Sequence, residues 1–224
     1  MTRIQNVSAI LFDMDGTLVD SEIFTERAVR KLCSELGVID ADIDCSAFDG
    51  VSWEEIGMAV VRRYPTLKFE QKIARRLHEI YQHLMVSEPP PPINKAREAV
   101  IAAHEFMPIA IVSSSHRESI EETIRRMEIA DFINLYVGAE DCDAFKPAPD
   151  GYLQAAKELR ADARECLVFE DSITGILAAR NAGMQVVAVT HGSSNVDQIR
   201  GMADMAINDY SELEDRFFER IRSL

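Results

Sequence analysis

Acidic side chains stand where two short apolar runs of this sequence end, and a serine stands at the end of another. Asp13 and Asp15 follow the first run, Ser113 follows the second, and Glu170 and Asp171 follow the third. Carboxylates brought together at one site would repel one another and resist ionising unless a cation lay among them. Hard oxygen ligands with room for water suit Mg²⁺. The residue types therefore favour a magnesium site.

A lysine in a stiff segment adds a group that can bind an anion. Lys146 lies in the segment Lys146-Pro147-Ala148-Pro149-Asp150, where the prolines restrict the backbone and could hold the ammonium near a bound anion. Phosphoryl transfer needs such groups, because the charge on the moving phosphoryl group must be offset. The sequence therefore predicts phosphoryl-transfer chemistry.

Buried strands are needed to position these polar groups. Apolar runs too short for typical helices suit strands buried on both faces, and they recur at 9–12, 109–112, 166–169 and 186–189. Helical patterns separate them, at 117–127, 151–159 and 173–182, the last closed by Gly183. Alternating strands and helices predict an α/β fold with a parallel sheet, whose ligands bind beyond the carboxyl ends of the strands.

The stretch from Ser21 to about Glu88 has a different pattern, with apolar residues at helical spacing and little strand signal. We expect an all-helical insertion. The run Pro89-Pro90-Pro91-Pro92 cannot continue a helix and should form a stiff connector back into the core. The expected domains are a discontinuous core of residues 1–19 and 89–224 and a helical domain of residues 20–88, with a closing amphipathic helix at 213–224.

The composition is that of a water-soluble globular protein with an acidic surface. The 224 residues are 47% hydrophobic and 28% charged, which argues against a disordered chain or a disulfide-stapled miniprotein. The 24 Lys and Arg against 38 Asp and Glu give a net charge of −14, so we expect no nucleic acid and no membrane as partner. The spacing of the four cysteines suggests neither zinc nor disulfides. Without a basic, apolar leader, the expected compartment is the cytoplasm.

A set of motifs gives the chain a specific resemblance. The segment Asp13-Met14-Asp15-Gly16-Thr17-Leu18-Val19-Asp20-Ser21-Glu22 resembles the first signature of the haloacid dehalogenase (HAD) superfamily, and Ser113, Lys146 and Glu170-Asp171 match its other signatures in order. The resemblance implies a Rossmann-like doubly wound parallel sheet core with an inserted all-helical cap domain. The helical stretch resembles the mobile cap of the branch that includes small-molecule phosphatases and β-phosphoglucomutase.

The resemblance also implies roles for the polar residues. Asp13 would be the nucleophile, whose carboxylate attacks phosphorus and forms an aspartyl-phosphate. Asp15 would be the general acid and base, which protonates the leaving oxygen and then takes a proton from the attacking water. Ser113, Ser114 and Lys146 would hold the phosphoryl oxygens.

The metal follows from the same resemblance. Mg²⁺ would be held by the Asp13 side chain, the Asp15 backbone carbonyl and Asp171, with Glu170 bound directly or through water. The cation would offset the repulsion between an anionic nucleophile and an anionic phosphate.

The segment Asp49-Gly50-Val51-Ser52-Trp53 lies where caps of this family approach the active site. Gly50 would let the backbone come close to a substrate, and Trp53 could stack on a sugar or else pack between cap helices. β-Phosphoglucomutase resembles this arrangement but has an arginine where Trp53 stands and a histidine near the position of Thr25. Their absence here disfavours a mutase.

The sequence therefore predicts a Mg²⁺-dependent phosphatase that acts on a small phosphorylated metabolite, a sugar or sugar-acid phosphate, as a monomer or else a homodimer. The alternatives are a β-phosphoglucomutase-type isomerase and a non-catalytic module that binds such a metabolite. A dehalogenase is disfavoured because those enzymes lack the Asp15 equivalent. His116, which could face the mouth of the site, is a further candidate residue.

Overall fold

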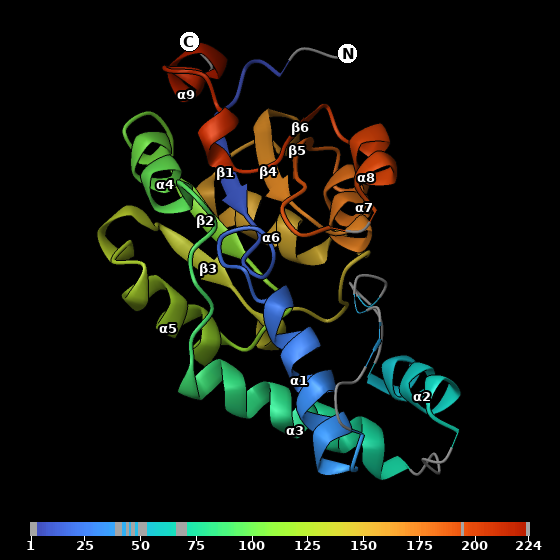
Figure 1. Cartoon of the computed structure of the whole chain (residues 1–224). Coiled ribbons are helices and arrows are strands. Elements are labelled where there is room, and N and C mark those ends of the chain that lie inside the picture. Colours follow the sequence, from blue (N-terminus) through green and yellow to red (C-terminus); the bar gives the residue numbers. More distant parts are fainter. Residues whose placement is uncertain are drawn as a thin grey trace. The chain divides into compact units, whose positions relative to one another are not determined.

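The computed structural model describes residues 4–38, 42, 43, 45, 48, 53–65, 71–193 and 195–222. The chain divides into two compact units, one formed by Met1–Asp20 with Pro92–Leu224 and the other by Ser21–Pro91. The first is an α/β unit, and the described elements of the second are helical (Figure 1). Among the described residues, no helix combines the length and the apolar character that crossing a bilayer requires.

A six-stranded parallel sheet forms the centre of the α/β unit, in the order β3-β2-β1-β4-β5-β6 (Figure 1). Its strands are β1 (Ala9–Phe12), β2 (Ile109–Val112), β3 (Leu135–Val137), β4 (Cys166–Glu170), β5 (Gln185–Val189) and β6 (Met205–Ile207). The predicted parallel sheet and its four buried strands are confirmed. The edge strands β3 and β6 were not predicted, because each has only three residues and is just partly buried.

Helices cover both faces of the sheet. They are α4 (Ala96–His104), α5 (Arg117–Arg126), α6 (Asp150–Leu159), α7 (Ile173–Asn181), α8 (Val196–Met202) and α9 (Phe217–Ile221). Side chains alternate across a strand, so Ile10 and Phe12 pack with α4, α5 and α9, whereas Ala9 and Leu11 pack with α6, α7 and α8. This is the predicted doubly wound, Rossmann-like arrangement.

The predicted closing helix at 213–224 is wrong in extent. Helix α9 covers only Phe217–Ile221, and Tyr210–Glu212 forms a separate 3₁₀ turn. Arg216 has a φ of 63°, a left-handed conformation that an α-helix cannot contain, so the helix starts after it. The predicted helix end at Gly183 is confirmed by its φ of 80°, which glycine adopts without steric cost.

The helical unit contains α1 (Glu22–Glu35), α2 (Trp53–Arg63) and α3 (Gln71–Ser87). Apolar residues predicted to share one helix face are buried in its core, at Ile73, Leu77, Ile80 and Leu84. Trp53 packs on α3, with its ring 5.7 Å from that of His78 and 5.1 Å from that of Tyr81. These contacts are those of a residue between helices, and Gly50 lies outside the described residues.

The chain leaves and re-enters the α/β unit at neighbouring points. Val19 pairs with Pro92 in an antiparallel bridge, and the Ile93 N–H donates to the carbonyl oxygen of Leu18, at 2.9 Å. The residues that follow β1 are therefore held by the segment that follows the proline run.

The sheet core gives a direct test of the packing. Leu167 in β4 is fully buried, and we expect Leu167→Ala to lower the free energy of unfolding by about 2–5 kcal/mol, because a cavity remains. Leu177 in α7 is 39% exposed, so Leu177→Ala should change that energy by about 0.5 kcal/mol or less. Urea denaturation measures both, and equal losses would contradict the described core.

Candidate active site

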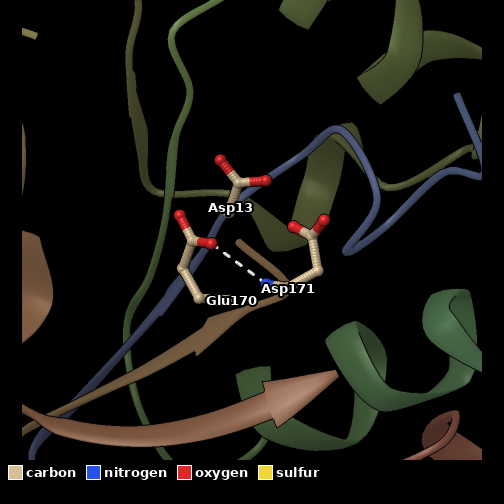
Figure 2. Close-up of side chains that lie close together, drawn as sticks. All are labelled: Asp13, Glu170 and Asp171. Atoms are coloured by element: carbon tan, nitrogen blue, oxygen red, sulfur yellow. Dashed lines mark hydrogen bonds between the residues drawn. The ribbon is translucent and has the colours of Figure 1, made fainter. Parts of the chain in front are cut away.

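The register of β1 and β4 brings two acidic segments together. Phe12 lies opposite Phe169, and the Asp13 N–H donates to the Phe169 carbonyl oxygen, at 3.0 Å. Asp13 therefore follows β1 beside Glu170 and Asp171 at the end of β4. Each of these three residues offers an oxygen within 4.8 Å of the others, and Figure 2 shows their carboxyl groups gathered close together.

The turn after β1 packs against the Asp171 carboxylate and donates a hydrogen bond to it. Gly16 has a φ of 77°, and a Cβ atom placed on it would lie 2.1 Å from Asp171 Oδ2. The hydroxyl of Thr17 donates to the other oxygen, Asp171 Oδ1, at 2.9 Å. Glycine is therefore required here for two reasons, its left-handed backbone and the close approach of a carboxylate.

Lys146 joins the two strand ends. Its ammonium donates to Asp13 Oδ1, to Glu170 Oε1 at 2.7 Å and to the Val112 carbonyl oxygen at 3.1 Å. An ammonium has three N–H donors, so these acceptors use all of them. Burial lowers the pKa of Lys146, but the charges of Asp13 and Glu170 outweigh burial and hold that pKa well above its ordinary value.

Asp13 is buried, and burial disfavours its charged form. Burial raises the pKa of Asp13 well above its ordinary value, although Lys146 opposes the shift. Positive charge next to Asp13 therefore favours its ionised form.

Glu170 is fully buried, and both of its oxygens already accept hydrogen bonds. Oε2 accepts from the Asp171 and Ser172 N–H groups at 3.0 and 2.9 Å and from the Ser172 hydroxyl at 3.0 Å. Oε1 accepts from Lys146 at 2.7 Å and from the Tyr152 hydroxyl at 3.0 Å. Glu170 is also held by packing, because a Cβ atom on Gly175 would overlap its Oε1 at 1.6 Å.

Asp15 is half-buried, and its side chain has one hydrogen-bond partner among the described residues. Its Oδ2 accepts from the Ser115 hydroxyl at 2.7 Å. Its Oδ1 is buried and accepts no hydrogen bond from the described residues. Since buried carboxylate oxygens rarely stay unpaired, Oδ1 is suited to meet a ligand.

The serine segment after β2 has one buried and one exposed hydroxyl. Ser113 is buried, and its Oγ accepts from the Ser115 N–H at 3.0 Å, so its own hydrogen is still available to donate. Ser114 is exposed. Glu140 occupies the N-terminus of α5, where its Oε2 accepts from the Arg117 N–H at 3.1 Å and its Oε1 lies 2.9 Å from His116 Nδ1. His116 is thus a surface partner of Glu140.

The donor set fits a hard divalent cation. Asp13 and Asp171 offer carboxylate oxygens that are close enough to share one ion, and oxygen ligands are those that Mg²⁺ and Ca²⁺ prefer. Glu170 would have to exchange protein donors for a direct bond to the ion. The geometry therefore suits two carboxylates as direct ligands, with Glu170 acting through water.

Sequence reasoning missed several residues that hold this arrangement. Thr17, Ser115 and Ser172 were visible as polar neighbours of the motifs, but nothing in the sequence says which oxygen each one reaches. Nothing in the sequence marked Tyr152 as part of the site, because an aromatic residue in a helical pattern is most simply interpreted as a core residue.

Comparisons with known proteins identify the chain's relatives. A family model described as "Haloacid dehalogenase-like hydrolase" matches residues 10–189. Hexitol phosphatase B of Escherichia coli is 26% identical, and the match covers 95% of this chain and 97% of that protein. Fructose-1-phosphate phosphatase YqaB of the same organism is 28% identical, and the match covers 83% of this chain and 97% of that protein. The crystal structure of β-phosphoglucomutase from Clostridium difficile has the same fold, with 22% identity and a TM-score of 0.67. The match covers 95% of this chain and 96% of that chain.

Gly16 and Gly183 form a matched pair for a test. Both have left-handed backbones, but a Cβ atom on Gly183 would meet nothing within 4 Å. We expect Gly183→Ala to cost about 1–2 kcal/mol of stability and to leave cation binding unchanged. Gly16→Ala should abolish binding of Mg²⁺, since Asp171 must move. Titration calorimetry with Mg²⁺ measures this, and equal affinity in the two variants would show that Asp171 is not a ligand.

Proposed function

The chain belongs to the haloacid dehalogenase-like hydrolases, and we propose that within this family it is a Mg²⁺-dependent phosphatase that hydrolyses a small phosphomonoester through an aspartyl-phosphate on Asp13. The observation that carries the proposal is the position of the Asp13 carboxylate, which contacts Lys146 and lies beside Glu170 and Asp171. The phosphatase names of the similar proteins support the same reaction class.

Asp13, the Asp15 backbone carbonyl and Asp171 would hold Mg²⁺, and Glu170 would reach it through water. When bound, the cation supplies positive charge that offsets the repulsion between the nucleophile and the phosphate. Asp13, whose pKa is raised by burial, would then be held in its ionised form.

The first step breaks the ester bond. An Asp13 oxygen attacks phosphorus, the bond from phosphorus to the alcohol oxygen breaks, and Asp15 gives its proton to that oxygen. In the second step water attacks the aspartyl-phosphate, Asp15 takes the proton from this water, and the bond between Asp13 and phosphorus breaks. The Asp15 Oδ1 atom, which has no partner among the described residues, is suited to carry this proton.

The remaining polar groups hold the phosphoryl oxygens. Lys146 donates from the side of β2 and β4, the Ser113 hydroxyl donates from the end of β2, and the Ser114 backbone N–H adds a third donor. Each of them stabilises negative charge on the oxygens as the bonds change. To meet phosphate, Lys146 must redirect at least one of the N–H groups that its protein acceptors use.

The substrate we propose is a sugar or sugar-acid phosphate. Two similar proteins carry the names of a hexitol phosphatase and a fructose-1-phosphate phosphatase. Phosphate release from a panel of phosphorylated metabolites would identify the class.

A β-phosphoglucomutase-type isomerase is the second candidate, because a structure of that enzyme shares the fold. It would move phosphate between two hydroxyls of one sugar. We expect the chain, given β-glucose 1-phosphate and Mg²⁺, to release one phosphate for each ester consumed. Enzymatic assays of phosphate and of glucose 6-phosphate separate the two reactions, and accumulation of glucose 6-phosphate would establish the mutase.

Replacing the nucleophile tests the mechanism. Asp13→Asn should lower hydrolysis of p-nitrophenyl phosphate by about a thousandfold or more, because the amide cannot form the acyl phosphate. Asp131 is an exposed aspartate of the same unit, and Asp131→Asn should keep wild-type activity. Undiminished turnover in Asp13→Asn would refute the assigned nucleophile.

A further inference from the structure

A buried tyrosine contacts both Lys146 and Glu170, which form an ion pair in the candidate site. Tyr152 in α6 is only 1% exposed. Its hydroxyl donates to Glu170 Oε1 at 3.0 Å, and the centre of its ring lies 5.1 Å from the Lys146 ammonium. The Lys146 ammonium therefore lies over the Tyr152 ring. In the proposed function, this ammonium binds the phosphate.

The hydroxyl of Tyr152 and the ammonium of Lys146 share one acceptor. Both donate to Glu170 Oε1. The hydrogen bond from the tyrosine therefore weakens the attraction between this oxygen and the Lys146 ammonium. Burial and the charge of Glu170 raise the pKa of Tyr152 well above its ordinary value, so the hydroxyl keeps its proton and acts as a donor. The ring face attracts the ammonium without using one of its N–H groups.

The position of Lys146 depends on a balance. Asp13 lies on one side of its ammonium and Glu170 on the other. A stronger Glu170 acceptor would draw the ammonium away from Asp13, which is where the phosphoryl group must be. A weaker one would let the ammonium pair with Asp13 alone.

The surrounding structure keeps the tyrosine in place. Helix α6 packs closely on β2, since a Cβ atom on Gly151 would lie 3.1 Å from both Val112 Cγ1 and Cys142 Sγ. Glu170 is confined on its other side by Gly175. This close packing leaves little room for the phenol or the carboxylate to shift.

We propose that Tyr152 is a positioning residue, which fixes the Lys146 ammonium between Glu170 and Asp13 through its hydrogen bond to Glu170 and through its ring. This inference rests on the proposed function in one respect, the assignment of Lys146 to the phosphoryl oxygens. It goes further by naming the residue that sets how strongly Lys146 holds them.

Tyr152→Phe removes the hydroxyl and keeps the ring, so the core packing is preserved. The matched control is Tyr136→Phe in β3, where the hydroxyl donates to Glu121 away from the site. Three quantities are measured for each protein: the inhibition or binding constant of orthophosphate with Mg²⁺, the Mg²⁺ concentration for half-maximal binding, and the melting midpoint. Hydrolysis of p-nitrophenyl phosphate is a fourth.

We expect Tyr152→Phe to weaken orthophosphate binding by about tenfold and to lower kcat/KM by a similar factor, the size of effect that loss of a hydrogen bond to a charged group gives. Mg²⁺ affinity should fall by less than orthophosphate affinity, because the proposed direct ligands Asp13 and Asp171 are unchanged and only Glu170, which would act through water, loses a hydrogen bond. The melting midpoint should fall further than it does in Tyr136→Phe, because the hydrogen bond lost is buried, so phosphate affinity and not stability is the deciding measurement. A residue that only fills the core would leave phosphate affinity unchanged.

Equal orthophosphate affinity in Tyr152→Phe and wild type would overturn the inference. A loss confined to Mg²⁺ affinity would overturn it too, since Tyr152 would then act on the metal. If the wild-type protein binds orthophosphate but hydrolyses no ester, the proposed function fails while the phosphate titration still decides the role of Tyr152. A wild-type protein that binds no orthophosphate would refute both.

Discussion

One buried ammonium holds the candidate site together. Lys146 contacts Asp13 after β1, Glu170 at the end of β4 and the Val112 carbonyl at the end of β2, so a single side chain links three neighbouring strands. Carboxylates this close and this buried would otherwise repel one another and take up protons. The function we propose uses the negative charge that remains, because one ammonium among three carboxylates leaves charge for a cation to offset.

Backbone geometry determines how close the acidic groups can come. Parallel pairing of β1 with β4 places Asp13 beside Glu170, and the left-handed turn at Gly16 leaves room for Asp171 where any side chain would collide. Gly175 does the same for Glu170. The acidic cluster is thus a consequence of strand register and two glycines.

The strands and helices that carry chemistry were predictable because they are strongly patterned. Ala9–Phe12 and Cys166–Glu170 are fully buried on both faces, which makes a continuous apolar run a reliable signal. The strands β3 and β6 lie at the sheet edges and are partly exposed, so they lack that signal. The end of the chain was misjudged because apolar spacing at 213–224 says nothing of the left-handed residue at Arg216.

The sequence by itself determined the residue types of the candidate site: a pair of aspartates after a buried strand, a serine, a lysine before two prolines and a second acidic pair, in an order that resembles one family. Only the tertiary structure decided which atoms meet. Asp13 and Lys146 are 133 positions apart, Asp15 and Ser115 are 100 apart, and Tyr152 and Glu170 are 18 apart. Sequence patterns report local periodicity, whereas hydrogen-bond partners across a sheet depend on register and packing, which arise only when the chain has folded.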